Sequence, residues 1–184
     1  AILRILQCKG FDDRWNGWIS SLLSSGSSSV LLNGVPGQHF KCKSGVQQGD
    51  PLSPLLFVIV VDLLQSVVND MCRRNILTLP IPTRSNDFPI VQYADDTLIV
   101  LPAVDSQLIA LKDMLQKFAE STGLHVNFSK SSLIPMNLSE EEGARIAALL
   151  GCSIGSMPFT YLGLPMGMSG PTIYDLMPLV DRIE

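Results

Sequence analysis

Two neighbouring acidic residues, Asp95 and Asp96, are the strongest candidates for chemistry in this chain of 184 residues. Their carboxylate oxygens are the ligands that hard cations such as Mg²⁺ prefer. Two such ions about 3.5 to 4 Å apart can activate an attacking oxygen and stabilise a leaving oxygen in phosphoryl or nucleotidyl transfer. Asp is also common in turns, so the pair alone does not establish a metal site.

Short runs of β-forming residues lie on both sides of this pair. One run extends from Ile90 to Tyr93, and another from Leu98 to Val100. Ala94-Asp95-Asp96 lies between them, which predicts a hairpin with two carboxylates at its bend. A hairpin of this kind would hold the negative charge at one defined place.

Three further segments carry residue types that suit the same chemistry. Gln48-Gly49-Asp50-Pro51-Leu52-Ser53-Pro54 lies about 40 residues before the acidic pair. Gly123-Leu124 with Asn127-Phe128-Ser129-Lys130, and then Tyr161-Leu162-Gly163-Leu164-Pro165, follow the pair. With Tyr93-Ala94-Asp95-Asp96, these segments resemble four motifs of reverse transcriptases in the same order. The detailed match is most similar to the polymerases of non-LTR (LINE-type) retrotransposons of plant genomes, and it covers nearly the whole chain.

This resemblance implies an α+β fold: a palm-like antiparallel sheet packed against helices, within an incomplete polymerase domain. Residues 1–184 would form a partial reverse transcriptase domain. The palm and part of the fingers would extend to about residue 135, and residues 136–184 would hold the end of the palm, the primer-grip region and the start of the following helices.

The resemblance also implies a role for each matched residue. Asp95 would be the principal metal ligand, and Asp96 a less direct carboxylate. Lys130 would approach the leaving pyrophosphate as a cation or general acid. Gln48 and Gly49 would contact the template and the nucleotide, and Tyr93 would lie near the primer terminus. A primer grip formed by Tyr161, Leu162 and Gly163 would hold the primer strand.

Two departures from the family pattern affect the expected activity. Gln47 stands where family members usually have Arg, so a positive charge near template or nucleotide phosphate is lost. The family's first catalytic Asp precedes the helix in which Ala1 falls, and Asp12 and Asp13 come too late to replace it. Two Mg²⁺ ions would then have too few ligands, and we expect residues 1–184 alone to be inactive.

Composition limits the partners of this chain. Hydrophobic residues make up 46% and charged residues 16%, so a globular fold is expected. The net charge of −4 argues against a protein that coats nucleic acid by charge alone. The resemblance implies an RNA template, a DNA primer and dNTPs as partners of the complete enzyme. The longest apolar run, Leu55 to Val61, ends at Asp62, which predicts no membrane span.

Four cysteines without paired spacing make a zinc site unexpected and predict reduced, buried thiols inside the cell. For a full element of the resembling family, a location in the nucleus or the cytoplasm is expected. They are Cys8, Cys42, Cys72 and Cys152.

Pattern and capping signals predict most of the remaining elements. Helices are expected after Asp12 or Asp13, from Ser53 as N-cap, from Val104 to Ser121, after Ser139 and from about Thr172. Strands are expected at Val30 to Leu32, with a returning strand around Phe40 and Cys42, and at Leu124 to Phe128, where Leu133-Ile134 pairs back. A last short strand is expected at Phe159 to Leu162.

Three alternatives remain open from the sequence. The chain could be a non-catalytic relic or a domesticated nucleic-acid-binding module, in which case Asp95→Ala would leave its binding unchanged. It could belong to another palm-type polymerase, such as an intron-encoded maturase or a viral RNA polymerase, which template and nucleotide preference would separate. An unrelated metal-dependent phosphotransferase would have to acquire all four motifs by chance.

Overall fold

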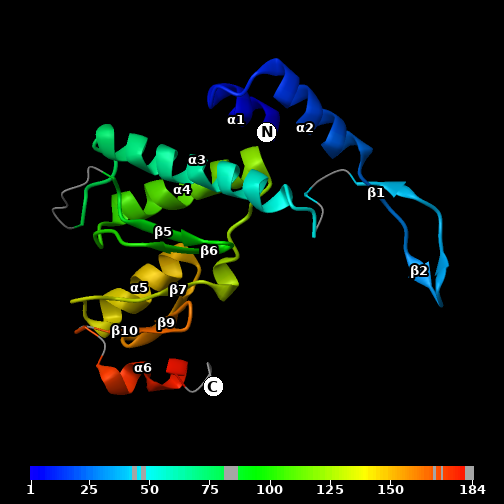
Figure 1. Ribbon diagram of the computed structural model, residues 1–184. Coiled ribbons are helices and arrows are strands. Elements are labelled where there is room, and N and C mark those ends of the chain that lie inside the picture. Colours follow the sequence, from blue (N-terminus) through cyan, green and yellow to red (C-terminus); the bar gives the residue numbers. More distant parts are fainter. Residues whose placement is uncertain (43–44, 47–48, 81–86, 168, 171, 181–184) are drawn as a thin grey trace. The chain divides into compact units, whose positions relative to one another are not determined.

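The computed structural model describes residues 1–42, 45–46, 49–80, 87–167, 169–170 and 172–180 (Figure 1). The chain divides into two compact units. The first comprises Ala1–Pro102 with Asp113–His125, and the second Ala103–Lys112 with Val126–Glu184. The mixture of helices and small sheets, mostly antiparallel, agrees with the α+β class. The assignment of segments to fingers and palm stays a prediction.

Three helices form the first part of the first unit. They are α1 (Ile2–Cys8), α2 (Asp13–Ser25) and α3 (Ser53–Arg73). Asp12 caps α2, as predicted, because its side chain accepts a hydrogen bond from the Trp15 N–H at 2.7 Å. One apolar side chain from each helix meets in a buried cluster that consists of Leu6, Ile19 and Leu56. An ion pair between Lys9 and Asp62 also joins α1 to α3.

Short strands between α2 and α3 form a two-part ribbon. β1 (Ser27–Ser28) pairs with β4 (Phe40–Lys41), and β2 (Leu31–Leu32) pairs with β3 (Val35–Pro36), both antiparallel. The predicted returning strand is therefore confirmed at Phe40, but it pairs with the serines rather than with Leu31-Leu32. Asn33-Gly34 reverses the chain directly after Leu32, so that Leu31-Leu32 pairs with Val35-Pro36 before the chain reaches Phe40. Both turn residues adopt the positive φ that a tight hairpin turn requires.

The helix α3 begins one residue away from its predicted cap. Leu52 is the N-cap and Ser53 the first helical residue, so the prediction of Ser53 as cap is wrong. The reason is Asp50, whose carboxylate accepts the Leu52 N–H at 2.7 Å and whose carbonyl accepts the Ser53 N–H at 3.1 Å. Pro54 lies in the first turn, as predicted.

Among the described residues, α3 is the one helix that is long and apolar enough to cross a membrane by length and composition, with a mean hydropathy of 1.8. The sequence argument counted uninterrupted apolar residues and so missed it, because one Asp62 does not make a 21-residue apolar helix polar. A core helix of a soluble protein passes the same test. Here Leu56, Leu64 and Val68 of α3 are buried within the first unit.

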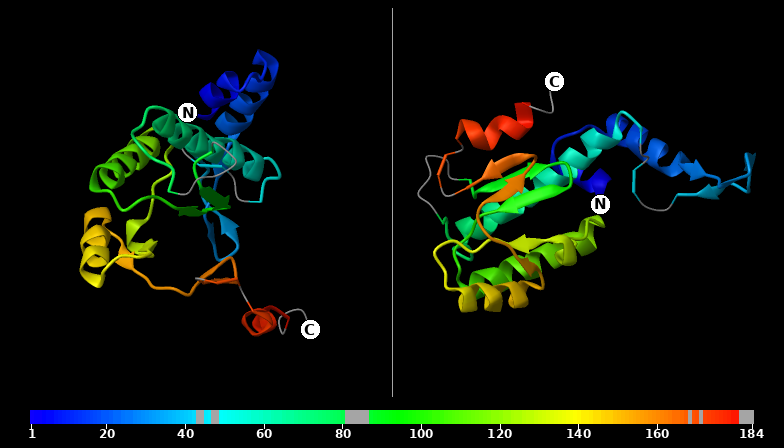
Figure 2. Two further views of the ribbon diagram at one scale, coloured as in Figure 1. Left: turned by 90° about the vertical axis from the view of Figure 1, so that its left-hand side faces the viewer. Right: turned by 90° about the horizontal axis from the view of Figure 1, so that it is seen from below.

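The predicted hairpin is present. β5 (Ile90–Tyr93) pairs antiparallel with β6 (Asp96–Ile99), in a register that joins Ile90 to Ile99 and Tyr93 to Asp96. The helix α3 lies over one face of this hairpin (Figures 1 and 2). The helix α4 (Asp105–Thr122) follows, and its residues divide between the two units. It lies within one residue of its predicted bounds.

The strand predicted from Leu124 to Phe128 is absent. Residues 124–127 have no regular structure, and η1 (Phe128–Lys130) is a 3₁₀ helix. The prediction of a strand from Leu124 to Phe128 is wrong because the side chain of Asn127 caps this short helix at the Lys130 N–H. β7 (Ser132–Leu133) therefore pairs in parallel with β8 (Ser153–Ile154), not with residues 124–128.

The rest of the second unit follows the sequence signals closely. α5 (Glu140–Leu150) has the predicted capping box between Ser139 and Glu142. β9 (Phe159–Tyr161) pairs antiparallel with β10 (Leu164–Met166), and α6 (Ile173–Val180) ends the described chain. The sequence signals missed β10.

All four cysteines are free thiols, but their predicted burial is wrong. Cys8 and Cys42 are exposed, and Cys72 and Cys152 are half-buried. Short elements explain this, since Cys42 follows a two-residue strand with no core beneath it. Partial burial raises the pKa of the Cys72 thiol.

We predict an acid-dependent contribution to stability from the pair of Asp105 and Arg145, which joins α4 to α5. Arg145 donates two hydrogen bonds to the carboxylate, at 2.7 and 2.9 Å, and these lower the pKa of Asp105. The contribution is therefore complete above the unfolded pKa of about 4 and is lost as pH falls through the lowered folded pKa.

Thermal unfolding of Arg145→Gln should accordingly show a lower Tm than wild type at pH 6, and the difference should shrink below about pH 4. Arg73→Gln is the control, since Arg73 makes only an exposed 3.6 Å contact with Asp70. An equal difference between Arg145→Gln and wild type at pH 6 and pH 2 would contradict the assignment.

Candidate active site

The two-residue turn between β5 and β6 positions the acidic pair. Tyr93 and Asp96 are the last paired residues of the two strands, and Ala94 and Asp95 form the turn between them. Ala94 has a φ of +48°, a left-handed conformation that lets the chain reverse within two residues. Asp95 thus lies at the tip of the hairpin, and Asp96 lies at the end of a hydrogen-bonded ladder.

Both carboxylates are exposed to solvent. Within the part of the chain that the structure describes, neither makes a hydrogen bond or ion pair with another side chain. Their oxygens are therefore available to a cation. The described residues contain no group of three or more His, Cys, Asp or Glu side chains that could hold a metal ion together.

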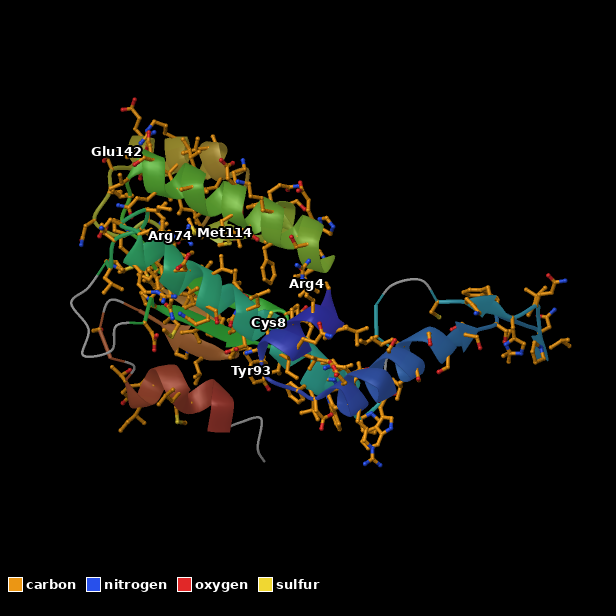
Figure 3. The ribbon with its side chains drawn as sticks, turned by 90° about the horizontal axis from the view of Figure 1, so that it is seen from above. Arg4, Cys8, Arg74, Tyr93, Met114 and Glu142 are labelled. Carbon is orange, nitrogen blue, oxygen red and sulfur yellow. The ribbon has the colours of Figure 1, made fainter. Side chains whose placement is uncertain are left out.

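Tyr93, labelled in Figure 3, is the last residue of β5. It is 64% exposed, and Val91 on the same face is 51% exposed. Ile90 and Gln92 alternate with them and are half-buried on the other face. Tyr93 is therefore not a core residue, and its ring is free to contact a ligand beside the acidic pair.

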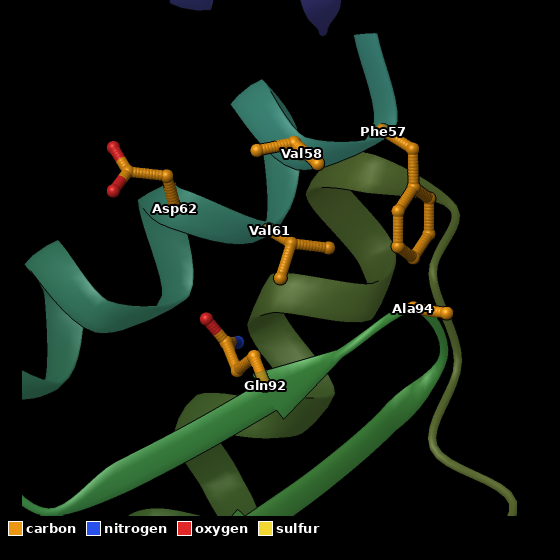
Figure 4. Close-up of a pocket in the computed structure, with 6 residues that line it drawn as sticks. All are labelled: Phe57, Val58, Val61, Asp62, Gln92 and Ala94. Atoms are coloured by element: carbon orange, nitrogen blue, oxygen red, sulfur yellow. The ribbon is translucent and has the colours of Figure 1, made fainter. Parts of the chain in front are cut away.

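The inner face of the hairpin borders a pocket of about 200 Å³ against α3. Gln92 projects from β5 into this space, and Asp62 of α3 lies across it (Figure 4). The Nε2 atom of Gln92 is buried and has no hydrogen-bond partner among the described residues. The full lining consists of Phe57, Val58, Val61, Asp62, Gln92 and Ala94.

A larger hollow, of about 880 Å³, lies in the first unit beside the predicted template and nucleotide segment. Asp50, Leu52 and Ser53 line it, together with hydroxyl-bearing residues such as Ser27 and Ser28. Gly49, the residue before Asp50, has a φ of +87°, a conformation that glycine adopts without strain. Gln47 and Gln48 lie outside the described residues.

The other predicted site residues belong to the second unit. Lys130 ends η1 with its side chain exposed, and the backbone there is fixed by the cap at Asn127. Leu162 and Gly163 form the turn between β9 and β10, with φ values of +52° and +81°. Tyr161 is half-buried, and its hydroxyl is buried with no partner among the described residues.

Comparison with known proteins places this hairpin in a family. The family model described as reverse transcriptase (RNA-dependent DNA polymerase) matches residues 2–166. The chain belongs to the reverse transcriptase family. The matched range includes the acidic turn, the segment around Gly49, Lys130 and the β9–β10 turn, so every predicted site residue falls within the reverse transcriptase match.

This reverse transcriptase domain is similar to Pol polyproteins of R2 elements, which are non-LTR retrotransposons. Two Pol polyproteins of the type-1 retrotransposable element R2 of Popillia japonica are each 28% identical to it and are covered along 31% and 27% of their length, with all of this chain aligned. A Pol polyprotein of the type-2 element R2DM of Drosophila melanogaster is 30% identical over 66% of this chain and 10% of its own length.

The non-LTR assignment is thus confirmed, and the plant-type assignment stays a prediction. The chain spans about a third of the length of the first two relatives.

Sequence reasoning missed Asp62 of α3 and Gln92 of β5, which line the pocket between α3 and the reverse transcriptase hairpin. Asp62 entered only as the residue that interrupts an apolar run. The only signal was its place between two apolar runs of the helix, and that does not predict a partner because an exposed carboxylate needs none. The partner, Lys9, lies 53 residues away in sequence and could not be named without the fold.

We predict that the turn conformation limits substitutions at Ala94. Ala94→Val should lower the free energy of unfolding by about 1 kcal/mol or more, because a β-branched residue is strained at positive φ. Ala94→Gly should leave it unchanged or raise it by up to about 1 kcal/mol. Urea unfolding measures both changes.

The matched control for the glycine change is Ala103→Gly, since Ala103 does not have a positive φ. That variant should be destabilised slightly, because glycine gains entropy in the unfolded chain. Destabilisation of Ala94→Gly equal to that of Ala103→Gly would show that the turn does not need its left-handed residue.

Proposed function

We propose that this chain is the part of an RNA-directed DNA polymerase that carries the acidic hairpin of the active site, and that it acts in nucleotidyl transfer with Mg²⁺. One observation carries the proposal. Asp95 and Asp96 stand exposed on a two-residue turn, without competing partners in the described chain, inside the segment that matches the family.

The donor atoms of the turn suit the proposed metal. Carboxylate oxygens are hard ligands, and Mg²⁺ prefers one or two of them together with water and substrate phosphates. We assign Asp95 as the principal ligand, because it lies at the tip, and Asp96 as the less direct one. The bound ions would supply activation of the attacking oxygen and stabilisation of the leaving oxygen.

The substrates we propose are an RNA template, a DNA primer and dNTPs. We assign contacts to template and nucleotide to Gln48 and Gly49. The hollow beside Asp50 and Ser53 is large enough for a nucleotide and combines apolar side chains such as Leu52 and Phe57 with the hydroxyl groups of Ser27, Ser28 and Ser53. The exposed ring of Tyr93 suits stacking at the primer terminus.

The second unit would supply two further functions. Lys130 is exposed and charged, which suits neutralisation or protonation of the leaving pyrophosphate. The Leu162-Gly163 turn presents a 46% exposed leucine, and with Tyr161 it would hold the primer strand. Such positioning can supply roughly 7 to 11 kcal/mol of a reaction barrier, so a grip without catalytic groups can matter greatly.

We also propose that both Mg²⁺ ions need a third carboxylate in addition to Asp95 and Asp96. Two adjacent side chains on one turn can surround an ion from one side only, and Mg²⁺ requires near-octahedral coordination. Primer extension on an RNA template with Mg²⁺ and dNTPs tests this requirement. Residues 1–184 alone should extend no primer, and robust synthesis would contradict it.

Metal binding by the hairpin provides the positive test. Mn²⁺, a paramagnetic substitute for Mg²⁺, should selectively broaden the amide NMR signals of residues 93–97 in the wild-type chain. Asp95→Asn should weaken this binding about tenfold or more, since it removes the proposed principal ligand.

The control is Asp113→Asn, which neutralises an exposed carboxylate on α4 and should leave the broadening at the turn unchanged. Broadening in wild type that is spread evenly over acidic residues would refute a specific site at the hairpin.

A further inference from the structure

Side-chain amides of α3 hold the open end of the acidic hairpin. Gln65 Nε2 donates to the backbone carbonyl of Phe88 at 3.1 Å, and Asn69 Oδ1 accepts the Phe88 N–H at 2.9 Å. Gln65 Nε2 also donates to Asn69 Oδ1 at 3.0 Å, and Asn69 Nδ2 donates to Asp87 Oδ1 at 2.9 Å. Both backbone groups of Phe88 are therefore bonded to one turn of helix.

The helical spacing of the two amides makes this contact possible. Residues four apart lie on the same face of an α-helix, so Gln65 and Asn69 point together at the strand. The ring of Phe88 is only 2% exposed, which places its backbone where water does not easily replace a lost partner. We call Gln65 and Asn69 the amide clamp.

The clamp acts directly before the strand that leads to the catalytic turn. The Phe88 carbonyl also accepts the N–H of Ile90, the first residue of β5, and the carbonyl of Pro89 accepts the Val100 N–H at 3.2 Å. The hydrogen-bonded ladder thus starts at the clamp and ends at Tyr93 and Asp96. A shift of Phe88 along α3 would be transmitted through this ladder to the turn.

We propose that Gln65 and Asn69 are positioning residues. They fix where the β5–β6 hairpin lies along α3 and how its Asp95–Asp96 turn is oriented, and so preorganise the turn for metal binding. This inference rests on the proposed function, because the turn is assigned there as the metal site. The same helix begins at Ser53, directly after the segment assigned to template and nucleotide. The helix α3 therefore supports both the acidic turn and the segment assigned to template and nucleotide.

The first measurement does not require metal. In the chain of residues 1–184, Asn69→Ala should accelerate amide hydrogen exchange of β5 and β6 about tenfold or more, while exchange in the middle of α3 changes little. Ser66→Ala is the control, because Ser66 lies on α3 and its hydroxyl bonds only the Asp62 carbonyl of the same helix. Unchanged exchange in the hairpin of Asn69→Ala would overturn the proposal.

The second measurement tests whether loss of the amide clamp changes metal binding at the Asp95–Asp96 turn. Asn69→Ala should weaken Mn²⁺ binding at residues 93–97 about tenfold, as loss of supporting contacts around metal ligands commonly does. N69D should weaken it as well, because it places a second carboxylate against Asp87. The double variant N69D/D87N should recover most of the affinity, since it restores this hydrogen bond with donor and acceptor exchanged.

The outcomes separate this inference from the proposed function. If wild type binds Mn²⁺ at the turn and Asn69→Ala binds it equally well, the clamp does not position the site. If wild type shows no binding, the metal assignment fails, and hydrogen exchange alone decides whether the clamp holds the hairpin. Should Asn69→Ala unfold the chain, Gln65→Met provides the same test, because it removes one bond to Phe88 and keeps the side-chain volume.

Discussion

The antiparallel ladder between β5 and β6 is the interaction on which the position of the acidic turn depends. Asp95 and Asp96 are exposed, and within the described residues neither side chain makes a hydrogen bond or ion pair that would hold the turn. The hairpin must therefore be held in place from elsewhere. That support comes from the ladder between β5 and β6 and from the face that β5 turns toward α3.

The helix α3 gives that support because it is apolar along most of its length and polar at a few places. Leu56, Leu64 and Val68 of α3 are buried in the first unit, although only 22% of its most apolar window is, whereas Asp62, Gln65 and Asn69 contact polar partners. Burying a polar group is costly unless it is hydrogen-bonded, and the half-buried Gln65 and Asn69 are both bonded, whereas Asp62 is exposed. Across the pocket, the buried amide nitrogen of Gln92 on β5 has no hydrogen-bond partner among the described residues.

Local signals predicted those elements whose stabilising contacts are close in sequence. The hairpin turn, the cap at Asp12 and the capping box at Ser139 are confirmed, since each depends on residues at most three or four positions apart. The prediction failed at Leu124 to Phe128, where apolar alternation is outweighed by the cap at Asn127. It failed again for the burial of the cysteines, because burial depends on how much core lies beneath each element.

The site divides in the same way. The sequence by itself determined that the chain carries an acidic pair at a turn, and the order of its motifs was enough to indicate the reverse transcriptase family. Those properties reside in residue identity and spacing along the chain.

Only the tertiary structure decided that Tyr93 faces outward, that Asp62 pairs with Lys9, and that Gln65 and Asn69 grip the backbone at Phe88. These contacts join residues 19 to 53 positions apart. No periodicity or motif specifies such a contact, because it forms only when packing of the apolar faces brings the two elements together.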